Sequence, residues 1–162
     1  RRGATSVVLA LGANLGPRLI TLRRAVDGIS RFVQIVRVSS LYETEPMDSI
    51  AGAPAFLNLA LSGVTSLKPL ELLDRVLQLE HRLGRRRRMR NDPRLIDIDI
   101  VFWGTTRVRS ARLVLPHPRY AAREFVLAPL RELELPWVDP GSGTAIGRLK
   151  GEGAVRLWGR LY

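Results

Sequence analysis

The segment LIDIDIVFW, residues 95–103, is the stretch that says most about this chain. Isoleucine and aspartate alternate from Ile96 to Ile100, which is the period of a β-strand with one apolar face and one polar face. Asp97 and Asp99 then share a face, with Cα atoms about 7 Å apart. Aspartate is disfavoured in strands and neighbouring carboxylates repel each other. The pair therefore indicates either a site for a hard divalent cation such as Mg²⁺ or a solvent-facing polar edge.

Outward from this strand, strand and helix patterns alternate along the chain. Apolar spacing predicts helices at 17–29, 69–83 and 124–133, and short apolar or alternating runs predict strands at 5–11, 32–44 and 56–65. Gly12 is expected to end the first strand. The order β-α-β-β-α-β predicts an α+β, ferredoxin-like split-βαβ fold, with an antiparallel sheet, helices packed on one face and a C-terminal extension. No linker divides the chain, so residues 1–162 are expected to form a single domain.

The amino-acid composition excludes several kinds of site and indicates one kind of ligand. The chain has 162 residues and a net charge of +11. Only Lys68 and Lys150 are lysines, and seven arginines cluster between Arg82 and Arg94, which indicates an anionic ligand. The absence of cysteine excludes disulfides, zinc–thiolate sites and cysteine nucleophiles. No apolar run approaches about 18 residues, so we expect no transmembrane helix. No apolar region with a cleavage site follows the start, so we expect no signal peptide.

The arginine-rich loop leads directly into the strand that carries the aspartate pair. The planar guanidinium group of arginine matches phosphate oxygens, and carboxylates beside arginines are what phosphoryl transfer needs. On its own, the arginine run is also typical of a solvated face or a nucleic-acid patch. His117, fixed between two prolines, is either structural or a phosphate ligand. Glu80, on the apolar side of its helix, either borders the apolar stripe or faces a ligand.

Four segments together, in this order, resemble the 6-hydroxymethyl-7,8-dihydropterin pyrophosphokinases of folate biosynthesis. They are LALGANLG at 9–16, SSLYETEP at 39–46, the run from FLN at 56–58 through LGRRRRMRNDPRLIDIDI at 83–100, and LPHPRYAAREFVLAPL at 115–130. The resemblance implies ATP-dependent transfer of pyrophosphate to the hydroxymethyl group of the pterin, with release of AMP. It also implies two Mg²⁺ ions, ATP as co-substrate, and a monomer that needs neither nucleic acid nor a membrane. The lack of cysteine fits a cytoplasmic location.

The same resemblance implies roles for individual residues. Asp97 and Asp99 would hold the metal ions, and Arg85 and Arg94 would join them as catalytic residues. The residues that would contact ATP are Leu73, Glu80, Arg87, Arg90, Ile100, Arg112, His117 and Arg123. The residues that would contact the pterin are Thr44, Glu45, Met47, Phe56, Asn58 and Phe125. These types suit a flat polar heterocycle, because aromatic rings cover its faces and an amide both donates to and accepts from its edge.

The sequence departs from the family pattern at Asn91-Asp92, where many members carry Trp-Gly. Stacking of that tryptophan on a ligand is lost here, so nucleotide affinity is the property most open to change. The competing hypothesis is a non-catalytic ferredoxin-like domain that binds a nucleotide or RNA. RNA-binding sheets of this type need exposed aromatic residues, whereas this chain places Asp97 and Asp99 on the strand in question.

Overall fold

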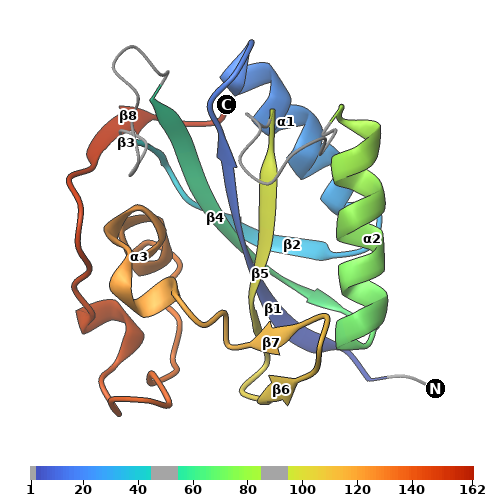
Figure 1. The fold of residues 1–162 in the computed structure, drawn as a ribbon, viewed down its shortest axis with the longest axis vertical. Coiled ribbons are helices and arrows are strands. Elements are labelled where there is room, and N and C mark those ends of the chain that lie inside the picture. The colour runs from blue at the N-terminus through green and yellow to red at the C-terminus, as the bar shows by residue number, and fades with distance from the viewer. Residues whose placement is uncertain (1–2, 45–54, 85–94) are drawn as a thin grey trace.

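The computed structural model describes residues 3–44, 55–84 and 95–162. Within these ranges a six-stranded antiparallel sheet is flanked by helices (Figure 1). The strands of this sheet are β1 (Thr5–Ala13), β2 (Gln34–Val38), β3 (Leu41–Thr44), β4 (Phe56–Thr65), β5 (Asp97–Trp103) and β8 (Arg156–Gly159). The α-helices are α1 (Arg18–Ile29), α2 (Pro69–Arg82) and α3 (Glu124–Arg131). The strand order is β5-β1-β4-β3-β8, β2 also pairs with β4, and β6 (Val108–Arg109) and β7 (Val114–Leu115) form a separate two-stranded sheet.

The two long helices cover one face of the sheet, which confirms the predicted α+β arrangement. On α2 the residues Leu72, Val76 and Leu79 are buried, at the spacing that puts them on one side of a helix. They share a core with Leu9 and Leu11 of β1 and with the buried side of α1. Across the described ranges, no helix is long and apolar enough to cross a membrane.

The opposite face of the sheet has a second core, which the predicted arrangement did not include. There α3 and the C-terminal extension bury Val8, Phe102 and Leu127, and the ring of Phe102 meets that of Tyr120 edge-on with centroids 4.9 Å apart. Figure 1 shows α3 on the other side of the sheet from α1 and α2. A strand that is buried on both faces reads as a continuous apolar run, which is what β1 has around Val8.

The predicted strand at 32–44 is wrong in one respect, because the structure divides it into β2 and β3. At the division, the backbone N–H of Ser39 donates to the carbonyl of Ala60 at 2.9 Å. Ser40 instead donates through its N–H and its hydroxyl to Oε1 of Glu132, both at 3.0 Å. Since Glu132 follows the last turn of α3, the interruption attaches the second layer to the sheet.

Candidate functional site

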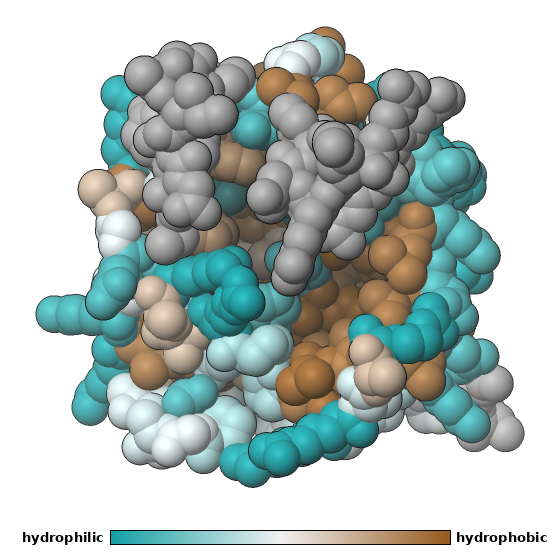
Figure 2. Space-filling model, viewed as in Figure 1, coloured by the Kyte–Doolittle hydropathy of each residue, from teal (hydrophilic) through white to brown (hydrophobic). Residues whose placement is uncertain are grey.

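A cavity of about 220 Å³ opens on the α3 side of the sheet, above β1, β4 and β5. Figure 2 shows a hollow on this side of the molecule, with hydrophobic residues in it and hydrophilic residues at its sides and below. The cavity is lined by Ala10, Leu11, Gly12, Thr44, Phe56, Asn58, Leu59, Asp97, Asp99, Arg123, Phe125 and Val126. Residues from four strands and one helix therefore converge on a single space.

Register across the sheet explains why the floor of the cavity is open. Gly12 of β1 pairs with Asn58 of β4 on one side and with Asp97 of β5 on the other. In the next row, Ala10 pairs with Asp99. Adjacent strands lie about 4.8 Å apart, so Asn58 and Asp97 are separated by roughly 10 Å with no side chain between them. The expectation that Gly12 ends the first strand is wrong, since β1 continues to Ala13.

Asp97 and Asp99 lie on the cavity side of β5, as the alternation predicts. Ile98 and Ile100 point to the α1–α2 core and are 5% and 4% exposed, whereas Asp97 is half-buried and Asp99 is exposed. Carboxylate oxygens are hard ligands, and Mg²⁺ takes one or two of them together with phosphate oxygens and water. Among the described residues no cluster of three or more His, Cys, Asp or Glu side chains has the geometry of a metal site. The two carboxylates fit a cation whose remaining coordination positions are taken by phosphate oxygens.

The walls of the cavity carry the aromatic and amide groups expected for a flat heterocycle. Phe56 comes from β4 and Phe125 from α3, so aromatic rings stand on two separate elements. The guanidinium of Arg123 lies 5.5 Å from the centroid of the Phe125 ring, within the range of a cation–π contact. Asn58 is 5% exposed and its Nδ2 donates to the Tyr42 carbonyl at 3.4 Å, which fixes the orientation of the amide.

His117 lies beside the cavity, where its charge state is set by its surroundings. Burial lowers the pKa of the imidazole; the Asp99 carboxylate opposes this, and Arg123 and Arg119 add to the lowering. The backbone N–H of Arg119 donates to Nδ1 of His117 at 3.2 Å. Because Nδ1 accepts, the neutral ring carries its proton on Nε2 and has a donor available at that atom.

Four of the residues predicted to contact ATP form a second group, on the α2 side of the sheet. Leu73 and Ile100 pack in the α1–α2 core. Glu80 is 2% exposed, and its Oε2 accepts from the Ile98 N–H at 2.8 Å. Arg112 forms an ion pair with Asp74 of α2 at 2.6 Å. The structure does not bring these side chains into the cavity, so their role as nucleotide contacts stays a prediction.

Six predicted site residues lie outside the described ranges: Glu45, Met47, Arg85, Arg87, Arg90 and Arg94. The departure at Asn91-Asp92 lies outside them too. Sequence reasoning missed five lining residues, which are Ala10, Gly12, Leu11, Leu59 and Val126. The sequence contains a signal for Ala10 and Gly12, because two small residues at i and i+2 of a strand leave space above one face of the sheet. Val126 carries no such signal.

Comparison with known proteins gives one consistent result. The family model described as 7,8-dihydro-6-hydroxymethylpterin-pyrophosphokinase matches residues 8–135. The chain is 42% identical over 127 residues to a Bacillus subtilis protein named 2-amino-4-hydroxy-6-hydroxymethyldihydropteridine pyrophosphokinase, covering 77% of this chain and 75% of that one. It is 43% identical over 129 residues to an Arabidopsis thaliana folate synthesis bifunctional protein, covering 78% of this chain and 26% of the relative.

Among solved structures, the wild-type HPPK-DHPS of Plasmodium falciparum with pteroate superposes with a TM-score of 0.69 at 17% identity, covering 90% of this chain and 42% of that one. At that identity the likeness concerns the fold. The chain thus spans less than half the length of several proteins that it matches, which carry further domains or segments.

Proposed function

This chain belongs to the 7,8-dihydro-6-hydroxymethylpterin-pyrophosphokinase family, and on that premise we propose that it transfers pyrophosphate from ATP to 6-hydroxymethyl-7,8-dihydropterin. In this reaction the hydroxymethyl oxygen forms a bond to the β-phosphorus of ATP. The bond from the β-phosphorus to the oxygen that bridges the α- and β-phosphates breaks. AMP leaves with that oxygen, and the hydroxyl proton is released. The observation that carries the proposal is that a carboxylate pair, two aromatic rings and an amide line one and the same cavity.

The pterin is assigned to the part of the cavity between β4 and α3. Phe56 and Phe125 supply apolar surface for the two faces of the ring. Asn58, with its amide oriented by the Tyr42 carbonyl, supplies hydrogen bonds for the edge, and Thr44 borders the same space. The hydroxymethyl group then points across Gly12 toward Asp97, since no side chain intervenes.

Asp97 and Asp99 are the residues that would hold Mg²⁺, and the family resemblance implies two ions. When bound, Mg²⁺ would neutralise charge on the triphosphate and lower the pKa of the attacking hydroxyl. The chain's own cation and hydrogen-bond donor act alongside. Arg123 lines the cavity, and Nε2–H of His117 is a donor beside Asp99. The arginines predicted to bind or activate the triphosphate, Arg85, Arg87, Arg90 and Arg94, complete the proposal. Catalysis of this kind rests on positioning and electrostatics.

The test is to measure AMP release from ATP with and without the pterin, at fixed Mg²⁺. AMP that appears only when both pterin and Mg²⁺ are present supports the proposed reaction. Release of ADP would mean ordinary γ-phosphoryl transfer. ATP binding without turnover would favour the competing hypothesis of a non-catalytic nucleotide-binding domain. Binding of single-stranded RNA with the pterin ignored would favour an RNA-binding domain.

We also propose that the protein acts as a monomer in the cytoplasm. The described residues of one chain bring the carboxylate pair, the aromatic rings and the amide into one cavity, which supports a monomer. Sedimentation velocity at working concentration, with the specific activity measured over the same range, tests the monomer. A specific activity that falls on dilution would contradict it.

A further inference from the structure

We propose that the C-terminal segment 151–156 positions both walls of the cavity and so sets its affinity for the pterin. This inference rests on the proposed function, because it takes the cavity to be the pterin site. The segment lies beyond residue 135, where the match to the family model ends. It runs from the start of α3 to the outer side of β3, and contacts the cavity wall at each end.

At the α3 end, the segment forms a short ladder with the residues that precede the helix. The N–H of Glu152 donates to the Ala122 carbonyl at 2.9 Å, and the N–H of Glu124 donates to the Glu152 carbonyl at 3.0 Å. Arg123 therefore lies between two backbone hydrogen bonds to one residue of the segment. Since Arg123 and Phe125 line the cavity, the ladder fixes where this wall stands.

Gly151 makes this contact close. A Cβ at position 151 would lie 2.6 Å from the backbone nitrogen of Glu124 and 2.7 Å from the carbonyl carbon of Arg123. Backbone atoms have no rotamer to change, so any side chain here displaces the wall. The N–H of Gly151 also donates to Glu124 Oε1 at 3.1 Å. Arg131 in turn holds that carboxylate through two hydrogen bonds, of 2.6 and 2.8 Å.

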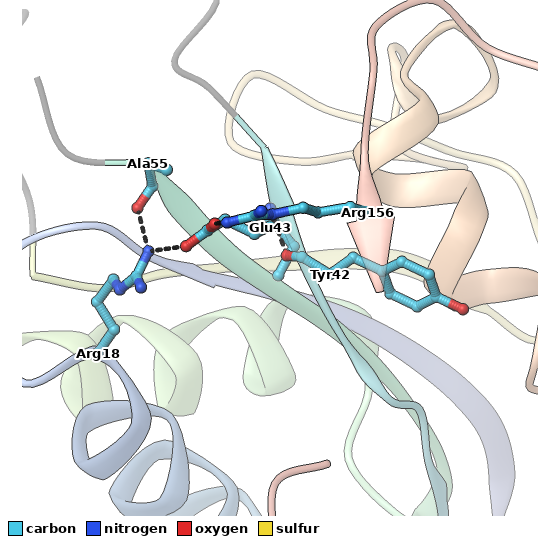
Figure 3. A network of polar contacts seen from close by, with 6 residues as sticks. Arg18, Tyr42, Glu43, Ala55 and Arg156 are labelled. Atoms are coloured by element: carbon cyan, nitrogen blue, oxygen red, sulfur yellow. Dashed lines mark hydrogen bonds and ion pairs between the residues drawn. The ribbon is translucent and has the colours of Figure 1, made fainter. Parts of the chain in front are cut away.

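At the β3 end, the segment holds the opposite wall. The Thr44 hydroxyl donates to the Ala154 carbonyl at 3.1 Å. Arg156 donates from Nε to Glu43 Oε1 at 3.1 Å and makes a second, shorter contact from Nη2. Figure 3 shows the Glu43 carboxylate between Arg156 and Arg18. Hydrogen bonds from these two arginines lower the pKa of Glu43, so the carboxylate stays ionised and keeps both partners.

Arg18 extends the same contact to the strand that carries Phe56. Its Nη1 donates to Glu43 Oε2 at 2.9 Å and to the Ala55 carbonyl at 2.7 Å. Thr44 and Phe56 are register partners across β3 and β4, and both line the cavity. The segment is thus hydrogen-bonded directly to both walls, and through Glu43 and Arg18 it also reaches the strand that carries Phe56. A fixed gap between the walls spares the pterin the cost of ordering them on binding.

The experiment compares Gly151→Ala with Gly147→Ala in the full chain. Both glycines lie in the C-terminal extension, but a Cβ at Gly147 meets nothing within 4 Å, so this variant is the matched control. The dissociation constant of the pterin is measured by calorimetry in the presence of Mg²⁺ and a non-hydrolysable ATP analogue, and the melting temperature is measured beside it. We expect Gly151→Ala to weaken pterin binding about tenfold at a temperature where it is folded, and Gly147→Ala to leave it unchanged.

A second variant acts at the other wall and leaves α3 untouched. Arg156→Gln removes the ion pair to Glu43, and we expect about a threefold rise in the KM for the pterin with kcat and the KM for ATP unchanged. If Gly151→Ala does not fold, this KM split decides the question. Equal pterin affinity in folded Gly151→Ala and Gly147→Ala, or an unchanged pterin KM in Arg156→Gln, would overturn the inference alone. Failure of the unaltered protein to bind the pterin would overturn the proposed function and this inference with it.

Discussion

Gly12 and Asn58 are register partners across β1 and β4, and the amide oxygen of Asn58 lies 2.9 Å from where a Cβ on residue 12 would stand. The glycine therefore leaves room for the Asn58 side chain as well as for a ligand. Gly12 has ordinary strand backbone, so this requirement comes from the close approach and not from its dihedral angles. The amide is a hydrogen-bonding group of the cavity, and its position depends on a neighbour without a side chain.

The first prediction is that Gly12→Ala raises the KM for the pterin about tenfold and changes kcat less. The added methyl pushes the Asn58 amide from its place, and a net hydrogen bond is worth about 1 kcal/mol, or somewhat more in a buried site. Steady-state kinetics against the pterin measures the change. Gly3→Ala is the control, because a Cβ there meets nothing within 4 Å. An unchanged KM would show that Asn58 does not contact the substrate.

The second prediction separates the roles of the carboxylates from that of the aromatic wall. Asp97→Ala or Asp99→Ala should lower kcat by about a thousandfold, since a lost metal ligand removes several kcal/mol of transition-state stabilisation. Phe56→Ala should act mainly on the KM for the pterin. The exposed Asp27 of α1 provides a control, Asp27→Ala, with full activity expected. Comparable losses of kcat in all three site variants would contradict this division of roles.

The third prediction concerns the contact between the two long helices. A Cβ on Gly28 of α1 would lie 2.4 Å from Cδ1 of Leu79 of α2, inside the core. Gly28→Ala should therefore destabilise the fold by about 1–3 kcal/mol, although alanine is the better helix former. Urea unfolding measures the loss. Its cost should shrink in a Leu79→Ala background, where the clashing atoms are absent. Additive costs in the double variant would place the strain elsewhere.

The fourth prediction is a pH dependence at the start of α3. The hydrogen bonds from Arg131 lower the pKa of Glu124 below its ordinary 4.5. A carboxyl whose pKa is lower in the folded state stabilises the fold above the ordinary value, and this contribution is lost as the pH falls through the lower, folded-state pKa. Glu124→Gln should thus reduce the melting temperature at pH 7, and the difference from the unaltered protein should narrow below pH 4.5.

The control for this fourth prediction is Glu134→Gln. The Glu134 side chain is 78% exposed and its ion pair with Arg37 lies at the surface, so the expected change in melting temperature is small at every pH. A melting-temperature difference for Glu124→Gln that stays constant from pH 7 to acid would show that packing, and not charge, makes the contribution.

Part of this fold can be read directly from local pattern. The predicted strand at 56–65 coincides with β4, and the apolar stripe at 72, 76 and 79 gives the buried side of α2. The alternation at 96–100 places Asp97 and Asp99 opposite the isoleucines, as found. These features follow from the fixed periods of strand and helix, which depend only on neighbours along the chain.

Other predictions from local pattern are wrong where a residue distant in the sequence forms the deciding contact. The interruption between β2 and β3 depends on Glu132, some 90 residues beyond Ser40, whose carboxylate takes the hydrogen bonds of that serine. Gly12 has the local signal of a turn but lies within a strand, because β4 and β5 pair with β1 on both sides at that point. The spacing of residues along the chain does not indicate such a pairing partner.

Local sequence pattern accounts for the three α-helices, for most strands of the main sheet and for the face that carries the aspartate pair, and the motifs identify the family. Only the packing of the whole chain places Asn58, Gly12 and Asp97 in one row, makes α3 the second wall, and brings residues 151–156 into hydrogen bonds with both walls. The reason is physical. Side-chain direction is set by the local backbone, whereas strand register and close backbone approach are set by which segments pack together, and that choice is made by the whole core at once.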